Sequence, residues 1–315
     1  MRLRILGSAA GGGVPQWNCG CPVCAAVRSG SRPVTRRFSS TIAVGDGAGE
    51  WFLGNAGPDL DIALCECPPL WPAPDDSTAP IHGVFLTDAE LDHTLGLLSL
   101  RQAGELHIYG TAAVRGLLSQ CGLLPTLESY TVVHWHEVRP GEQFALHYRH
   151  GEVSPLWCEP FDATTGRVPR YARGRYPGST ALLPDPGSPG VVIGYRITDE
   201  RTGRSAVFLP SVAALDERLL DQLRGSDLLL VDGTFWTDDE LRQNRRGTAT
   251  ARSMGHLPVN DVAGSLQLLR QLTDTQIVYT HLNNTNPMLF NDAPERACLA
   301  DAGATVAHDG AEYEL

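Results

Sequence analysis

The chain has 315 residues, a length that suits two average domains or one large layered domain. Hydrophobic residues make up 42% and charged residues 19%, with no run of 18 apolar positions, which excludes a disordered chain and a membrane span. The 25 Lys and Arg against 36 Asp and Glu leave a net charge of −11, which argues against a nucleic-acid binder. The residues before Gly7 form no export signal, so we expect a cytoplasmic protein.

Short runs rich in apolar and β-branched residues predict strands along the whole chain. In order, they are Leu3–Leu6, Thr41–Val44, Trp51–Leu53, Gly83–Leu86, Leu106–Tyr109, Thr131–Trp135, Val191–Ile197, Ala206–Leu209, Leu228–Val231 and Ile277–Tyr279. Helical spacing of apolar residues predicts helices over Thr94–Ala103, Ala112–Cys121, Glu217–Leu223, Val262–Leu272 and Pro294–Ala302. Strands that are apolar throughout, such as Leu228–Val231, indicate sheets covered by helices on their outer faces.

No internal repeat and no linker of distinct composition divides the chain, so residues 1–315 are predicted to form a single domain. An irregular loop is expected at 162–190, because its end is rich in Pro and Gly. Three arginines in this loop are candidates for contacts with an acidic substrate: Arg170, Arg173 and Arg175. A loop that merely faces solvent is the alternative.

Three cysteines lie within six residues, at Cys19, Cys21 and Cys24. Three thiolates on one tight loop can converge on a tetrahedral ion while another segment supplies the fourth ligand. This spacing predicts a structural zinc site rather than disulfides, with buried free thiols as the alternative.

Two segments place histidines at the ends of predicted strands. After Leu86, the loop carries Asp88, Glu90, Asp92 and His93 directly before an apolar helix. Carboxylates before a helix are often only caps, but capping does not explain His93, whose neutral ring is free to bind a metal. The second histidine, His281, follows Ile277–Tyr279 and precedes several Asn side chains. The pair indicates a metal centre.

These motifs resemble the metallo-β-lactamase superfamily. Asp88-x-Glu90-x-Asp92-His93 stands where that superfamily carries H-x-H-x-D-H, and His281 matches its last metal histidine. Asp232 and His256 also occupy familiar positions. More narrowly, the chain is similar to the pyrroloquinoline quinone biosynthesis protein B family, through its glycine-rich start, the stretch from Asp92 to Arg101, and the run from His281 to Pro287. The resemblance implies an αββα sandwich of two mixed sheets flanked by helices, with the active centre at one sheet edge.

The departures from the hydrolase pattern are informative. Superfamily hydrolases usually hold two zinc ions, yet Asp88 and Glu90 replace two histidines of the first ion. No histidine lies between His150 and His256 to supply the third, and Pro210-Ser211 stand where a bridging Asp is expected. Asp92, His93 and His281 remain as a set of two histidines and one carboxylate, which is the facial triad of nonheme Fe(II) oxygenases.

The family resemblance implies the same chemistry, an iron- and O₂-dependent hydroxylation in the biosynthesis of the quinone cofactor. The implied substrate is a tyrosine-derived ring in a peptide already cross-linked between Glu and Tyr. Iron would be bound by Asp92, His93 and His281. Residues expected to orient ligands, exchange protons or hold substrate are Glu90, Asp232, His256, Asn283 and Asn286.

Two other functions stay open. In the second hypothesis, the metal site no longer supports catalysis and the chain is a carrier for the quinone or its precursor. In the third, the chain is a zinc-dependent phosphoesterase. In related phosphodiesterases, the fourth ligand of the cysteine-bound zinc is a histidine three residues beyond the last active-site histidine. This chain has Asn284 there, so the identity of its fourth zinc ligand stays open. We expect one Fe(II) and one structural zinc per chain, no nucleic-acid or membrane partner, and a homodimer as one form of assembly.

Overall fold

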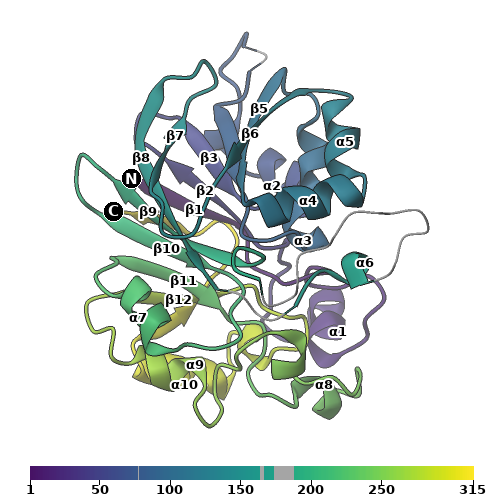
Figure 1. Cartoon of the computed structure of the whole chain (residues 1–315). Helices are drawn as coiled ribbons and strands as arrows, with labels where there is room; N and C mark the ends of the chain where they lie inside the picture. The colour runs from purple at the N-terminus through teal and green to yellow at the C-terminus, as the bar shows by residue number, and fades with distance from the viewer. Residues whose placement is uncertain (77, 164–166, 174–187) are drawn as a thin grey trace.

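A computed structural model describes residues 1–76, 78–163, 167–173 and 188–315, without the side chains of Arg170 and Arg173. Two seven-stranded sheets lie face to face, with helices on their outer sides (Figure 1). This arrangement confirms the predicted four-layered αββα sandwich. No helix of the described residues is long and apolar enough to cross a membrane.

The first sheet has the strand order β14-β1-β2-β3-β4-β5-β6. Its members are β1 (Arg2–Gly7), β2 (Thr41–Gly45), β3 (Trp51–Gly54), β4 (Ile81–Phe85), β5 (Glu105–Gly110), β6 (Val132–Glu137) and β14 (Glu312–Glu314). The second sheet has the order β13-β12-β11-β10-β9-β8-β7. Its members are β7 (Phe144–His147), β8 (Val153–Asp162), β9 (Ile193–Asp199), β10 (Ser205–Leu209), β11 (Leu228–Asp232), β12 (Gln276–Thr280) and β13 (Ala304–Val306).

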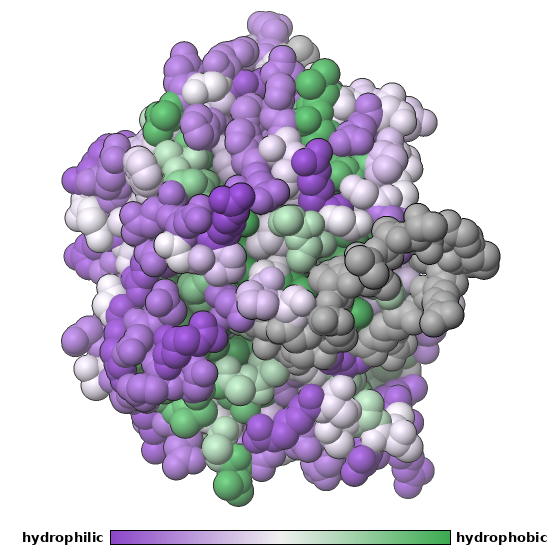
Figure 2. Space-filling model, viewed as in Figure 1, coloured by the Kyte–Doolittle hydropathy of each residue, from purple (hydrophilic) through white to green (hydrophobic). Residues whose placement is uncertain are grey.

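Helices cover both outer faces. The α-helices are α1 (Pro22–Ser29), α2 (Leu60–Cys65), α3 (Leu91–Thr94), α4 (Ala112–Gln120), α5 (Leu123–Glu128), α6 (Arg170–Arg173), α7 (Glu217–Leu223), α8 (Glu240–Gln243), α9 (Ser265–Leu269) and α10 (Pro294–Asp301). Short 3₁₀ turns lie at η1 (Pro68–Leu70), η2 (Leu95–Leu100), η3 (Arg252–Met254) and η4 (Pro287–Leu289). On the face shown in Figure 2, the described residues form a mostly hydrophilic surface with small apolar areas.

Two separate cores hold these layers together. Side chains from the facing sides of both sheets, such as Phe52, Phe85 and Phe208, form the core between the sheets. In β11, Leu228 and Leu230 belong to that core, while Leu229 and Val231 pack under the outer helices. The period of two in a strand produces this division, and it explains why the whole segment is apolar.

Most predicted elements are confirmed, but two helices differ. Over Thr94–Ala103 the chain forms the 3₁₀ turn η2 instead of an α-helix. Here the Gly96 amide donates to Ala56 O at 2.9 Å, and a Cβ on Gly96 would lie 2.0 Å from Gly57 O. This close backbone approach competes with a regular helix. Over Val262–Leu272 only α9 is helical. The sequence analysis also missed the strands β7, β8, β13 and β14 and the short helices α1, α2, α3, α5, α6 and α8.

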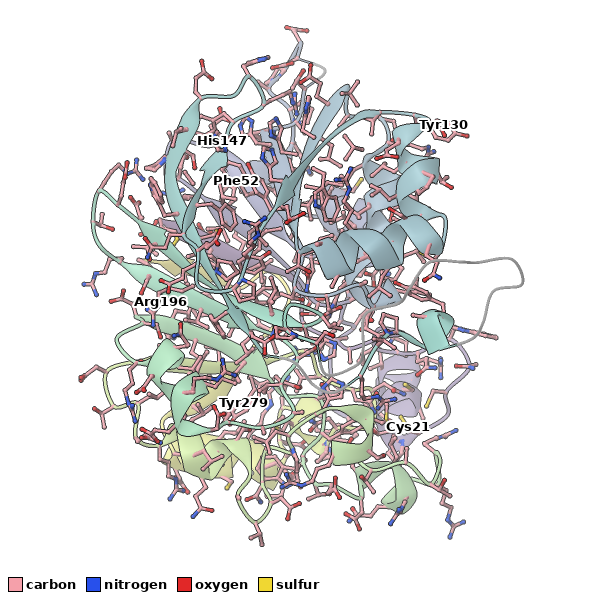
Figure 3. All side chains as sticks on the ribbon, viewed as in Figure 1. Cys21, Phe52, Tyr130, His147, Arg196 and Tyr279 are labelled. Atoms are coloured by element: carbon pink, nitrogen blue, oxygen red, sulfur yellow. The ribbon has the colours of Figure 1, made fainter. Side chains whose placement is uncertain are left out.

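A stack of histidines closes the edge where the two sheets meet. His136 of β6 stacks on Tyr109 with ring centroids 4.5 Å apart, and on His147 of β7 at 5.7 Å. His107 Nδ1 lies 2.8 Å from His136 Nε2. Figure 3 shows His147 at this edge, close to Phe52 in the same view. Burial and the neighbouring imidazoles lower the pKa of His136 to about 4.

The low pKa of His136 predicts acid sensitivity. Because unfolded histidine has a pKa near 6.5, the unfolded chain takes up this proton first, and stability is lost as the pH falls from about 6.5 towards 4. His136→Phe keeps a stacking ring without a titrating group. Between pH 7 and 4.5, the variant's melting temperature should fall less than that of wild type, by about 2 °C or more. The exposed His150→Phe serves as the control, and parallel pH profiles for His136→Phe and wild type would contradict the assignment.

Candidate metal centre

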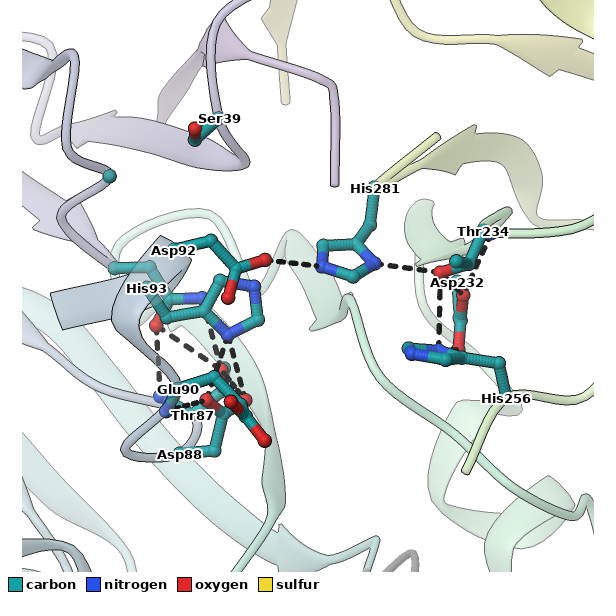
Figure 4. A network of polar contacts seen from close by, with 12 residues as sticks. Ser39, Thr87, Asp88, Glu90, Asp92, His93, Asp232, Thr234, His256 and His281 are labelled. Atoms are coloured by element: carbon teal, nitrogen blue, oxygen red, sulfur yellow. Dashed lines mark hydrogen bonds and ion pairs between the residues drawn. The ribbon is translucent and has the colours of Figure 1, made fainter. Parts of the chain in front are cut away.

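The candidate centre lies where strands of the two sheets end. Asp88, Asp92 and His93 follow β4 of the first sheet, whereas Asp232 and His281 end or follow β11 and β12 of the second. Figure 4 shows His281 between Asp92 on one side and the Asp232–Thr234 group on the other. The two sheets must therefore pack face to face before the site exists.

His93 is held by a carboxylate that the sequence analysis placed at a lost ligand position. Its Nδ1 lies 2.9 and 2.8 Å from the two oxygens of Asp88. Asp88 is itself fixed by the Thr87 hydroxyl and the Glu90 amide, at 3.0 and 2.9 Å. The Nε2 atom of His93 is buried and has no hydrogen-bond partner among the described residues. Asp88 thus orients the ring so that an unpaired nitrogen points into the centre.

His281 is held from the other sheet. Its backbone has φ +56°, an uncommon conformation for a residue with a side chain. Thr234 donates its hydroxyl to Asp232 Oδ1 at 2.6 Å, and so accepts from His281 Nδ1 at 2.7 Å. His281 Nε2 is then the unprotonated nitrogen, 3.3 Å from Asp92 Oδ2. Sequence reasoning missed Thr234, although the short Asp232-Gly-Thr234 segment after a buried strand was the available signal.

Asp92, His93 and His281 each offer one ligand atom, and these atoms all lie within 4.8 Å of one another. The ring centroids of His93 and His281 are 5.0 Å apart, and the two ring planes form an angle of 60°. A second set, Asp232, His256 and His281, meets the same distance criterion. The first set fits a metal better, because its His93 Nε2 has no partner, whereas the oxygens of Asp232 already accept four hydrogen bonds.

The ionisation of the centre agrees with this choice. Burial disfavours a charge on His93, but the carboxylates of Asp88 and Asp92 outweigh it and raise the pKa of His93 to about 9. Burial also opposes the charge on Asp92, yet His93 and His281 hold the pKa of Asp92 well below its usual range. Burial and the charges on His93 and His256 outweigh Asp92 and lower the pKa of His281. The carboxylates therefore favour positive charge in the middle of the site.

His256 and Asp232 form a separate pair beside the centre. His256 Nδ1 lies 2.7 Å from Asp232 Oδ2, and the ring of His256 is 5.5 Å from that of His281. Burial works against the charged form, but Asp232 outweighs it and raises the pKa of His256. A small cavity of about 50 Å³ opens between His256, Glu90 and Arg167. The arrangement can hold a proton next to a space that admits part of a ligand.

The cysteine site lies at the start of α1 (Figure 3). Cys19, Cys21 and Cys24 are buried, unpaired, and have sulfur atoms within 4.8 Å of one another. Cys21 caps the helix by accepting from the Cys24 amide, Pro22 begins it, and Gly30 ends it with φ +65°. The side-chain amide of Asn284 lies 3.4 Å from Cys24 Sγ, and the Cys21 thiol is 3.2 Å from Asn284 O.

Other predicted site residues lie elsewhere. Asn286 is fully buried, and its side chain bonds Gly233 O at 2.8 Å and the Met288 amide at 2.9 Å. Its polar atoms are thus engaged by the backbone, and its predicted role in holding substrate stays a prediction. Asn283 lines a polar cavity that is described below. The backbones of Arg170 and Arg173 form α6; their side chains, and all of Arg175, lie outside the described residues.

Comparison with known proteins identifies the family. A model of the β-lactamase superfamily domain matches residues 50–282. Coenzyme PQQ synthesis protein B of Pseudomonas fluorescens is 39% identical across all of both chains, and that of Cupriavidus taiwanensis is 40% identical across 99% of each. The chain belongs to the coenzyme PQQ synthesis protein B family.

A solved member of this family has closely similar coordinates. The structure of Zn²⁺-bound PqqB from Methylobacterium extorquens superimposes with a TM-score of 0.88 at 34% identity, covering all of both chains. A diphosphatase of the PhnP family matches with a TM-score of 0.67 at 19% identity, covering 100% of this chain and 97% of that one. The second likeness shows the shared metallo-β-lactamase fold and no more.

The orientation of His93 by Asp88 can be tested on metal binding. Asp88→Asn keeps the shape of the side chain but removes the charge that fixes Nδ1–H, so Fe(II) affinity should fall about 10- to 100-fold. Anaerobic Fe(II) titration of the metal-free protein measures this, with the exposed Asp61→Asn as the matched control. Equal affinities for Asp88→Asn and wild type would show that Asp88 does not position the ligand.

The cysteine site should bind a zinc ion that supports folding. Cys21→Ser should lower both the zinc content and the melting temperature, because the free energy of metal binding adds to the free energy of folding. The exposed Cys65→Ser is the control and should change neither quantity. Full zinc content in Cys21→Ser would end the zinc assignment.

Proposed function

We propose that the protein takes part in the biosynthesis of the coenzyme PQQ as an Fe(II)- and O₂-dependent hydroxylase. Its substrate is the tyrosine ring of a precursor in which Glu and Tyr are already cross-linked. The single observation that carries the proposal is the set Asp92, His93 and His281, in which both histidines turn an Nε2 atom towards one point. Membership in the PQQ synthesis family supports the biological setting.

The ligand set favours iron over a hydrolytic pair of zinc ions. Two imidazoles and one carboxylate form the facial triad, whose Fe(II) leaves adjacent coordination positions for O₂ and substrate and supplies the redox chemistry. A zinc pair needs more nitrogen ligands, and the place of the first ion holds Asp88, whose oxygens are engaged by His93, Thr87 and the Glu90 amide. This occupation of Asp88 opposes the phosphoesterase hypothesis.

The chain's own residues have separable tasks. Asp88 and Thr234 set the orientation of His93 and His281, as described above. His256 receives and returns a proton at Nε2, since its Nδ1 is bound to Asp232. Glu90 and Arg167, which line the cavity with His256, contact the polar groups of the substrate. The cysteine-bound zinc holds the 16–24 segment and does not take part in turnover.

Oxygen incorporation tests the function directly. Protein reconstituted with Fe(II) without air is exposed to O₂, a two-electron reductant such as ascorbate, and the cross-linked Glu–Tyr peptide. One oxygen atom enters the ring and the other leaves as water, so mass spectrometry should detect the added oxygen. His256→Asn should retain iron and slow turnover by roughly 100-fold or more, because general acid–base catalysis is lost. The exposed His150→Asn should behave as wild type. If iron-loaded wild type adds no oxygen yet binds PQQ tightly, the carrier hypothesis replaces this one.

A further inference from the structure

A second polar cavity, of about 240 Å³, lies next to the cysteine loop. Three separate segments line it, and they contribute Gln16 and Asn18, Arg246, and Asn283 with Thr285. We call it the Arg246 cavity. None of the described residues that line it is acidic. Its polar groups are amides, a hydroxyl, the Cys19 thiol and one guanidinium, and the guanidinium is the group that suits an anion.

The guanidinium of Arg246 is available to a ligand. The side chain is exposed, and within the described part of the chain it forms no ion pair. The Arg246 side chain lies next to the cysteine loop, since a Cβ built on Gly20 would be 3.7 Å from Arg246 Nη2. By contrast, the neighbouring Arg242 already donates to Thr248 O at 2.9 Å. The charge of Arg246 favours the thiolate form of Cys19, but among the described residues no group accepts a hydrogen bond from its guanidinium. Its forked donor pair matches a carboxylate.

Behind the cavity lining, Thr285 contacts the buried Glu240. Glu240 accepts the Trp236 amide at 2.7 Å and contacts the Thr285 hydroxyl at 2.5 Å, and that hydroxyl accepts from Asn283 Nδ2 at 2.5 Å. Burial raises the pKa of Glu240 to about 8, so its carboxyl is largely neutral at pH 7. At the rim, Asn18 Oδ1 accepts from Gln16 Nε2 at 2.8 Å, which leaves the Asn18 amide N–H groups for a ligand.

The cavity adjoins the metal centre. Asn283 follows His281 by two residues, a distance of at most about 7 Å along the chain. The backbone N–H of Asn283 donates to Thr234 O at 3.1 Å. On the other side, a Cβ on Gly12 would meet Gln16, and one on Gly11 would lie 3.2 Å from Asp92 Oδ2. The same two segments therefore contact both the iron ligands and the Arg246 cavity.

We propose that the Arg246 cavity binds a carboxylate group of the ligand, with Arg246 as its ion-pair partner and Asn18 as a hydrogen-bond donor. The inference rests on the proposed function only for the identity of that ligand, an amino-acid-derived acid whose ring lies at the metal. The proposal makes Arg246 a residue that determines ligand specificity, in addition to the metal centre and the arginines of the 162–190 loop.

The test measures binding of PQQ, a tricarboxylate, to the intact metal-loaded protein by calorimetry. Arg246→Gln should raise Kd about 10-fold or more, because a charge-assisted bond is lost. Arg246→Lys should have an intermediate effect, since it keeps the charge without the fork. The matched control, Arg242→Gln, should leave Kd unchanged. PQQ trimethyl ester should bind wild type weakly and should not distinguish wild type from Arg246→Gln.

Turnover separates this inference from the proposed function. If the chain hydroxylates, Arg246→Gln should raise KM with kcat little changed. Weaker PQQ binding by Arg246→Gln supports the cavity even if wild type adds no oxygen, an outcome that removes only the hydroxylase. An unchanged Kd in Arg246→Gln overturns the cavity and leaves the hydroxylase standing. The cavity proposal is also overturned if wild-type protein does not bind PQQ, or if it binds PQQ trimethyl ester as tightly as PQQ.

Discussion

The centre depends on one constraint, which is that each histidine has its Nδ1 held by an oxygen from its own sheet. Asp88 holds His93 at the end of the first sheet, and Thr234 holds His281 at the end of the second. Both rings then present Nε2, and Asp92 adds a carboxylate oxygen beside them. The two halves meet through the packing of Phe52, Phe85 and Phe208 between the sheets and through backbone hydrogen bonds, such as that from the Ile193 amide to Thr87 O at 2.8 Å. These contacts bring the candidate ligands together.

This constraint explains how one fold changes its chemistry. The family shares its fold with hydrolases such as the PhnP-family diphosphatase. In this chain Asp88, in the loop after β4, binds the neighbouring His93 ring. A carboxylate that accepts from an imidazole, a hydroxyl and an amide makes a poor ligand for a second ion, but a good anchor for the ring of a ligand. Function thus follows the hydrogen bonds around the site more than the architecture.

Strong local signals in the central strands predicted sheets covered by helices, and the family resemblance implied the four-layered arrangement. Leu228–Val231 is apolar on both faces, and Glu217–Leu223 has helical spacing with Asp216 as its cap. Strand β8 was missed because Pro155 and Pro160 weaken the strand pattern, although β8 lies between β7 and β9. Helix α1 was missed, although Pro22 at its start and Gly30 at its end are ordinary helix signals, because its cysteines were assigned to a metal loop.

The candidate metal ligands could be named from the sequence because they lie at the ends of predicted strands, but their hydrogen-bond partners could not. Thr234 is 47 residues from His281, and only the pairing of β11 with β12 brings them together. The sequence alone gave Asn286 the same polar character as Asn283, while burial separates a structural amide from one that lines a cavity. Arg246 had no distinguishing signal in the sequence, since only the fold places it beside Gln16, Asn18 and Asn283.

X-ray absorption at the iron edge of Fe(II)-loaded protein, prepared without air, tests the central claim most directly. The structure predicts a light-atom shell of oxygen and nitrogen with the multiple-scattering pattern of two imidazoles, contributed by His93 and His281. His93→Ala should leave one imidazole or no bound iron. A sulfur shell, which would place iron at Cys19, Cys21 and Cys24, or a pattern of three imidazoles, would contradict the account.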